Sequence, residues 1–282
     1  MKPVLVIHGG AGSRPLKGEN RIQIEASLKH VLSKAYPILA RGGSALDAVV
    51  AAAVELENDP LFNAGYGSKI QSDGRIRMSA ALMDGERRRF SGCVNVERVK
   101  NPILLAQGLQ NKSDRVLSGK GGERFARALG LKFGSQVTPR QLEIFRKTKR
   151  GKSGTIGAVA LDRAGRLAAA TSTGGKGFEY PFRVSDSPTV AGNFANGDCA
   201  VSATGTGEEI VECSAAAAIC AYVEAGMSLK SALAKLFGQV RKRKLEFGVI
   251  ALNSRGEYFA TTSTASIIWA AADPDGLHIL RR

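Results

Sequence analysis

The chain has 282 residues, 44% of them hydrophobic, which is enough to bury the core of one large domain or two small ones. Its formal net charge of +15 would suit an anionic partner, but the basic residues stand in separate runs without interleaved aromatic side chains. That distribution argues against nucleic-acid binding as the main function. No apolar leader opens the chain and no apolar run reaches the ~18 residues of a membrane span, so we expect a soluble, cytoplasmic protein without membrane contact.

The N-terminal part of the chain indicates a strand followed by two helices. The apolar stretch Pro3–Gly10 ends in two glycines and predicts a short strand, and a helical pattern then runs over about Asn20–Arg41. Ser44 precedes a second apolar run, and Asp47 follows at the spacing of a capping box, so a second helix begins there. Pro60 helps to end that helix.

Turn motifs divide the segments that follow. The "SDG" and "MDG" motifs favour turns between strands, and two apolar stretches after them favour helices. The expected strands lie near Lys69–Gln71, Ile76–Met83 and Phe90–Val96, and the expected helices near Pro102–Leu109 and Glu123–Leu129. The basic segment Pro139–Lys152 has almost no apolar face, and we expect it to be exposed.

The second half of the chain contains an internal repeat. Thr155–Thr173 and Glu246–Thr264 align without a gap, and each predicts a strand, a turn and a second strand. These strands are apolar on both faces, which fits a sheet buried on both sides. With helices expected over Glu208–Gly226 and Ser228–Arg241, the economical architecture is an α+β fold of two stacked sheets between helix layers. A chance likeness between two small apolar hairpins is the alternative explanation of the repeat.

Several common catalytic arrangements are missing from the sequence. The three histidines, His8, His30 and His278, do not accompany a G-x-S-x-G motif, so a Ser-His-Asp hydrolase is disfavoured. No H-E-x-x-H motif or paired His and carboxylate spacing predicts a metal site. The glycine-rich "HGGAGSRP" and "SGKGGERF" also lack the spacing of nucleotide-binding loops.

Hydroxyl side chains among glycines are the remaining candidates, in "GTIG", "TSTGG" and "SATGTGEE". A threonine hydroxyl needs an adjacent base, and a threonine at a chain N-terminus carries one, an α-amino group with a pKa of about 7.7–8.0. Cleavage before Thr155 would create this base, and Gly154, which lacks a Cβ, would permit the strained geometry of an N-to-O acyl shift. An ordinary junction between a loop and a strand is the competing interpretation of this motif alone.

Nine motifs stand in one order along nearly the whole chain: "VIHGGAG", "GGSALDAV", "DPLFNAGYGS", "MDG", "GTIGAVALD", "ATSTGG", "RVSDSP", "TGTGE" and "TTSTASIIWAA". In this order the chain resembles the plant-type L-asparaginase and isoaspartyl peptidase family of N-terminal nucleophile hydrolases. The resemblance implies a single αββα four-layer sandwich over residues 1–282 that cuts itself between Gly154 and Thr155. Fragments 1–154 and 155–282 would stay together, and two such units would pair into an (αβ)₂ homodimer.

The same resemblance implies the catalytic residues. Thr155 is expected to be the nucleophile for self-cleavage and for turnover, and Thr173 the hydroxyl that supports it. Thr204 and Gly205 are expected to form the oxyanion hole, which would stabilise the charge on the attacked carbonyl oxygen. Asn63 stands where the family has an active-site asparagine.

The substrate site is expected after the second hydroxyl motif. Arg183 offers a guanidinium fork to an α-carboxylate, and Asp186 can hold an α-ammonium, so the pair would recognise the head group of a free amino acid. The resemblance adds Thr206 and Gly207 to this site. Phe182 and Ser185 stand where relatives usually have glycine, so we expect two additional side chains at the substrate rim.

The resemblance implies no cofactor for catalysis but a structural sodium ion in the loop that contains Asn63. Main-chain oxygens would hold it, and such ligands leave no trace in the side-chain sequence. The expected ligands are the main-chain oxygens of Leu56, Glu57, Asp59, Phe62, Ala64 and Tyr66.

The activity that follows is hydrolysis of β-aspartyl (isoaspartyl) dipeptides and L-asparagine, with release of L-aspartate through an acyl-enzyme on Thr155. Three alternatives stay open. A glycosylasparaginase would be expected to have "TGNG" in place of "TGTG", and a threonine endopeptidase of the same fold would lack Asp186. From another class of protein, the chain could be an uncleaved basic scaffold that binds anionic partners.

Overall fold

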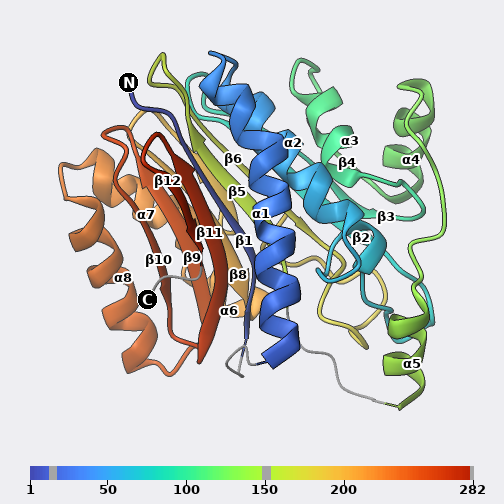
Figure 1. Ribbon diagram of the computed structural model, residues 1–282. Helices are drawn as coiled ribbons and strands as arrows, with labels where there is room; N and C mark the ends of the chain where they lie inside the picture. The colour runs from blue at the N-terminus through green and yellow to red at the C-terminus, as the bar shows by residue number, and fades with distance from the viewer. Residues whose placement is uncertain (13–17, 148–153, 280–282) are drawn as a thin grey trace.

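The computed structural model describes residues 1–12, 18–147 and 154–279 and shows a mixed α+β fold (Figure 1). Its larger sheet has eight strands in the order β12-β11-β1-β5-β6-β2-β3-β4. In chain order these strands are β1 (Val4–Gly12), β2 (Met78–Asp84), β3 (Arg89–Val96), β4 (Val116–Ser118), β5 (Ile156–Leu161), β6 (Leu167–Thr173), β11 (Ser266–Asp273) and β12 (Gly276–Ile279). The smaller sheet, in the order β10-β9-β8-β7, contains β7 (Asn193–Ala195), β8 (Cys199–Gly205), β9 (Phe247–Asn253) and β10 (Tyr258–Thr262).

Helices pack on both sheets (Figure 1). The first half of the chain contributes α1 (Gly18–Ala40), α2 (Ala45–Asn58), the short 3₁₀ helix η1 (Gly65–Gly67), α3 (Pro102–Leu109), α4 (Gly119–Ala128) and α5 (Pro139–Lys147). The second half contributes α6 (Gly207–Glu212), α7 (Ala215–Glu224) and α8 (Leu229–Lys242). Within the described residues, no helix combines the length and apolarity that crossing a bilayer requires.

Three apolar clusters hold these elements together. Leu32 of α1 and Val49 of α2 pack with Ala158 of β5 on one face of the larger sheet. The next residue of that strand, Val159, points to the other face and packs with residues of β9 in the smaller sheet. A third cluster joins α7 and α8 to the smaller sheet, with Leu236 among its members. Because successive strand residues enter different clusters, β5 is apolar on both faces and fully buried, as the sequence predicts.

The internal repeat forms two hairpins, as expected. Thr155–Thr173 contains the antiparallel pair β5 and β6, and Glu246–Thr264 contains the pair β9 and β10. The two hairpins lie in different sheets, a placement that the repeat itself does not reveal.

Ser44 caps α2 as predicted, since its hydroxyl accepts from the Asp47 amide at 3.1 Å. Two other expectations are wrong. The expected strand Lys69–Gln71 joins no ladder. The segment after β6 contacts it through the Phe178 amide, which donates to the Ile70 carbonyl at 2.9 Å, and through side-chain hydrogen bonds of Gln71. The expected helix Glu208–Gly226 is interrupted at Ser214, which adopts a left-handed φ of 47° and separates α6 from α7.

Two further predicted helical segments have different ends in the structure. The helix expected at Glu123–Leu129 begins earlier, at Gly119, and ends at Ala128. The basic segment expected over Pro139–Lys152 is helical over Pro139–Lys147 and largely exposed there, while its remainder lies outside the described residues.

A buried polar network lies between the sheets behind β5. The His8 imidazole Nε2 and the Ser202 hydroxyl are 2.9 Å apart, and the Ser202 and Thr171 hydroxyls are 2.7 Å apart. Burial lowers the pKa of His8 to about 3, so the imidazole is neutral at physiological pH. A Cβ on Gly157 would overlap both Ser202 Oγ and His8 Nε2, so only glycine lets β5 approach this network.

We therefore expect Gly157→Ala to lower the free energy of unfolding by about 1–3 kcal/mol, because the added methyl group overpacks a rigid interior. Gly238→Ala is the matched control: a methyl group added to this helical glycine would meet no atom within 4 Å, and alanine should stabilise α8 by about 0.5–1 kcal/mol. Urea denaturation of both variants measures the difference. Equal effects of the two substitutions would contradict the packing argument.

Candidate active site

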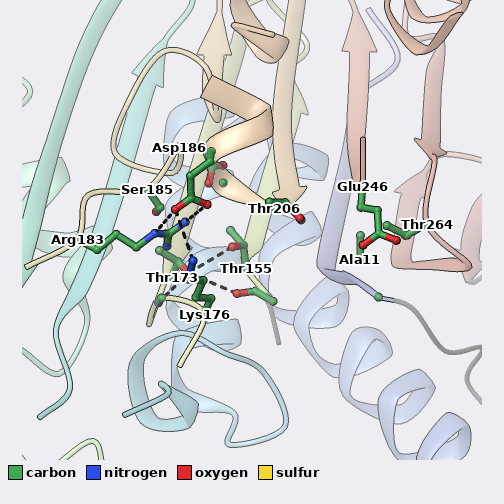
Figure 2. A pocket seen from close by; sticks show the side chains of 16 residues that line it. Ala11, Thr155, Thr173, Lys176, Arg183, Ser185, Asp186, Thr206, Glu246 and Thr264 are labelled. Carbon is green, nitrogen blue, oxygen red and sulfur yellow. Dashed lines mark hydrogen bonds and ion pairs between the residues drawn. The ribbon is translucent and has the colours of Figure 1, made fainter. Parts of the chain in front are cut away.

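A pocket of about 500 Å³ opens where the ends of β1, β6 and β8 meet (Figure 2). Residues predicted from the sequence make up more than half of its lining: Gly154, Thr155, Thr173, Arg183, Ser185, Asp186, Gly205, Thr206 and Gly207. Asn63 and Thr204 do not line the pocket but form hydrogen bonds with Gly154 and Thr155 beside it. The structure thus brings residues from both halves of the chain to one place.

Strand register places two threonine hydroxyls together. Ile156 of β5 pairs with Ser172 of β6, so the residue before one strand lies next to the last residue of the other. Thr155 is buried, with 5% exposure, and its hydroxyl donates to the Thr173 hydroxyl at 3.3 Å. A hydroxyl pair at the floor of a pocket can supply a nucleophile and a group that orients it.

The carbonyl before Thr155 is held from two sides. The Asn63 side-chain amide donates to the Gly154 oxygen at 2.5 Å and to the Gly175 oxygen at 2.5 Å, while its own oxygen accepts from the Lys69 amide at 3.0 Å. The Thr173 hydroxyl lies 3.4 Å from the same Gly154 oxygen. These donors polarise the carbonyl and can stabilise negative charge on its oxygen.

Thr204 and Gly205 lie on the opposite side of Thr155, at the end of β8. The Thr204 hydroxyl is fully buried, accepts from the Ala11 amide at 3.2 Å and lies 3.5 Å from the Thr155 carbonyl oxygen. Gly205 lines the pocket with a φ of 144°, and a Cβ there would lie 2.5 Å from the Phe247 Cα. A side chain is therefore excluded at Gly205, which leaves its backbone open to the pocket.

Arg183 has a partner that the sequence analysis missed. Its Nε and Nη2 each donate to the Glu208 carboxylate at 2.7 Å, and the Lys176 ammonium lies 3.6 Å from that carboxylate. The hydrogen bonds from Arg183 lower the pKa of Glu208 to about 2. Glu208 follows directly after the "TGTG" motif, so its position next to a predicted site was the available signal.

Asp186 is a buried acid with 2% exposure. Burial raises its pKa to about 7, although the nearby Arg183 charge acts in the opposite direction. Among the described residues its Oδ2 has no hydrogen-bond partner. A Cβ on Gly207 would lie 2.8 Å from both Asp186 Oδ1 and Arg183 Nη2, so this glycine allows the two charged groups to approach the same point.

The expectation that Phe182 and Ser185 both enter the substrate rim is half right. Ser185 lines the pocket, whereas Phe182 does not. The Phe182 ring is 60% exposed, and the guanidinium of Arg77 lies 4.0 Å from its centroid. This contact with a buried arginine holds the ring away from the pocket.

The loop between α2 and η1 brings main-chain oxygens close together. A Cβ on Gly65 would overlap the Glu57 carbonyl, and one on Gly67 would overlap the Phe62 carbonyl. Asp59 and Ala64 direct their carbonyls at amides within the same loop, at 3.2 and 3.1 Å. Among the described residues no group of three or more acidic, histidine or cysteine side chains could hold a metal ion, so a cation here would depend on main-chain oxygens.

The Glu57 side chain links this loop to the pocket. It is fully buried, and its Oε1 accepts from the Ser172 hydroxyl at 2.6 Å and from the Ile103 amide at 3.1 Å. Burial raises the pKa of Glu57 to about 8. Because Ser172 directly precedes Thr173, this contact fixes the strand that carries the second hydroxyl of the pocket.

The remaining part of the pocket was not predicted. Besides Gly175, Lys176 and Glu208, it consists of Ala11 and Gly12 at the end of β1, Glu246 before β9 and Thr264 after β10. Figure 2 shows Ala11, Glu246 and Thr264 grouped together, apart from Arg183 and Asp186.

Comparison with known proteins gives a consistent result. A family model described as asparaginase matches residues 1–280. The isoaspartyl peptidase/L-asparaginase of a Nostoc species is 44% identical over 293 residues, which cover 96% of this chain and 92% of the relative. The protein of the same name from a Synechocystis species is 42% identical, with 96% and 88% covered, and that from Bos taurus is 38% identical, with 99% and 96% covered.

Proposed function

The chain belongs to the asparaginase family, and we propose that it is a self-cleaving threonine hydrolase that releases L-aspartate from β-aspartyl dipeptides and from L-asparagine. The observation that carries the proposal is the Gly154 carbonyl, held by Asn63 and Thr173 next to the Thr155 hydroxyl. The paired charges of Arg183 and Asp186 in the same pocket supply a site for an amino-acid head group.

We propose that the fold is an αββα four-layer sandwich cut between Gly154 and Thr155. The three apolar clusters support the layer order, since one lies between the sheets and one lies between each sheet and its helices. In the larger sheet, β1 pairs with β5 and β2 pairs with β6, so strands of fragment 1–154 flank strands of fragment 155–282. Cleavage would therefore leave one folded unit.

Pairing of two such units into an (αβ)₂ homodimer is part of the proposal. Exposed apolar side chains on the segment after β6, Tyr180, Phe182 and Val184, offer surface for such an interface.

Self-cleavage begins with attack of the Thr155 Oγ on the Gly154 carbonyl carbon. The new C–O bond forms as the C–N bond breaks, which gives an ester and a free α-amino group on Thr155. The Asn63 amide donates to the oxygen on which negative charge develops. Water then hydrolyses the ester and releases the new C-terminus at Gly154.

In turnover, the freed α-amino group removes the proton from the Thr155 Oγ, because its ordinary pKa of about 7.7–8.0 suits a general base at neutral pH. The oxygen attacks the side-chain carbonyl of the substrate, and the oxyanion hole proposed at Gly205 and Thr204 would stabilise the developing charge, with the Gly205 backbone at the pocket. Ammonia or an amine takes the proton and leaves, and water hydrolyses the acyl-enzyme to L-aspartate.

Arg183 and Asp186 orient this substrate. Glu208 already occupies Nε and Nη2 of Arg183, which leaves Nη1 for the α-carboxylate and keeps the guanidinium plane fixed. Asp186, once ionised, accepts the α-ammonium. Its Oδ1 lies beside Gly207, which lines the pocket, and is the oxygen placed to receive this group.

A sodium ion in the loop before η1 completes the proposal. The residues fit this group because the Glu57 and Phe62 carbonyls lie close against Gly65 and Gly67, and main-chain carbonyls are hard oxygen donors of the kind that such cations prefer. The ligands would be the main-chain oxygens of Leu56, Glu57, Asp59, Phe62, Ala64 and Tyr66. The ion would stiffen the loop that positions Asn63.

Intact mass under denaturing conditions tests the cleavage. We expect wild-type protein to resolve into fragments 1–154 and 155–282 and Thr155→Ala to stay whole, because alanine has no nucleophile. Thr155→Ser keeps a hydroxyl and should still cleave. Thr261→Ala, the same truncation in β10 outside the pocket, should cleave like the wild type. Fragments from Thr155→Ala would refute the assignment of the nucleophile.

The pKa of Asp186 predicts a pH dependence of substrate binding. Below pH 7 the carboxyl group takes up a proton and loses its attraction for an α-ammonium, so KM for L-asparagine should rise by up to about tenfold per pH unit as pH falls. Succinamate lacks the α-ammonium, and its KM should not follow this titration. Steady-state kinetics between pH 5 and 8 compares the two, and parallel KM profiles would count against the role of Asp186.

The sodium site can be tested by thermal unfolding at constant ionic strength. Replacement of tetramethylammonium by Na⁺ should raise Tm along a saturable curve, because a bound ion stabilises the folded state. Gly65→Ala should abolish this rise, since the new methyl group would overlap the Glu57 carbonyl. Gly130→Ala imposes similar backbone strain where no atom lies within 4 Å, and it should keep the rise. Equal Tm values in both salts would exclude the site.

A further inference from the structure

The proposed function uses only one side of the pocket. Arg183 and Asp186 hold the head group on that side, and Thr155 stands at the reacting carbonyl. The lining also includes Glu246 and Thr264, which take no part in the proposed reaction. Figure 2 shows these two beyond Thr155 from the charged pair, so the pocket continues past the nucleophile.

This second side lies where a leaving group must go. With the head group at Arg183 and Asp186 and the carbonyl at Thr155, the bond that breaks points away from the head group. The leaving group of L-asparagine is ammonia, which is too small to reach Glu246. The leaving group of an isoaspartyl peptide is an amino acid, whose side chain would extend into this space.

The main chain fixes the position of Glu246. Its amide donates to the Glu209 carboxylate at 2.5 Å, and its carbonyl accepts from the Thr206 amide at 3.0 Å. Thr206 lines the same pocket, so the start of β9 is tied to the substrate site. These main-chain hydrogen bonds therefore hold the Cα of Glu246 at the pocket rim.

The Glu246 carboxylate gives the second side its charge. Over residues 1–12, 18–147 and 154–279, no side chain forms a hydrogen bond or an ion pair with this carboxylate. The two basic side chains of the lining, Lys176 and Arg183, both pair with Glu208 instead. A cationic group entering this side would be attracted to the Glu246 carboxylate, and an anionic group would be repelled.

We propose that this side of the pocket, formed by Ala11, Gly12, Glu246 and Thr264, binds the leaving residue of isoaspartyl peptides. Glu246 then selects leaving residues with a cationic side chain, such as lysine or arginine, over those with an acidic one. This inference rests on the proposed function and names the substrate class within it.

The test compares kcat/KM for β-aspartyl-lysine and β-aspartyl-glutamate, with L-asparagine hydrolysis as a check that each preparation is mature. The wild type should prefer the lysine peptide by about two- to fivefold at low salt, the size expected for a solvent-exposed charge contact. Glu246→Gln should bring the ratio close to one, and Glu246→Lys should invert it. Glu212→Gln removes the same charge from an exposed residue outside the pocket and should leave the ratio unchanged.

The outcomes separate the two ideas. If the wild type hydrolyses L-asparagine and both peptides with equal efficiency, or if the ratio survives Glu246→Gln, the leaving-residue site is wrong while the proposed function stands. If the wild type, shown by mass to be cleaved, hydrolyses none of the three compounds, both proposals fall.

Discussion

The position of β5 between β1 and β6 is the constraint on which the site depends. Thr155 directly precedes β5 and Thr173 ends β6, so the ladder between these adjacent strands brings the two hydroxyls together without any loop having to close. The ladder with β1 fixes the opposite edge of the strand. Gly157, two residues after Thr155, lets the neutral His8 and Ser202 lie directly behind the strand. A nucleophile built in this way is positioned by the sheet itself.

The carbonyl beside that nucleophile depends on a different part of the chain. Asn63 comes from the loop after α2, and the neighbouring Glu57 contacts Ser172 on β6 through its buried carboxyl group. One loop therefore restrains both the bond before Thr155 and the strand that carries Thr173. The loop after α2 and strands β5 and β6 are far apart in sequence, and the packing of α2 on the larger sheet brings them together.

Features that depend on residues close in sequence were predicted better than features that depend on contacts between distant segments. The Ser44 cap and the two hairpins of the repeat were predicted because each depends on residues close in sequence. The strand expected at Lys69–Gln71 was wrong, because Ile70 and Gln71 are buried in a loop that joins no ladder. Glu208 escaped prediction because its role arises only when Arg183, from another segment, reaches it. Most site residues came from motif resemblance, which carries information that spacing and composition do not.

The electrostatics of the pocket differ from those of the whole chain. The net charge of +15 suggests an attraction for anions, yet the pocket contains three acidic side chains, Asp186, Glu208 and Glu246, against the basic Lys176 and Arg183. Glu208 offsets one of the two positive charges of Lys176 and Arg183, so a ligand meets the remaining positive charge together with Asp186 on one side of Thr155 and Glu246 on the other. Salt screens the distant surface charges, so their electrostatic effect extends only about a Debye length. A basic protein can thus present a site that favours an ammonium group at each end of its substrate.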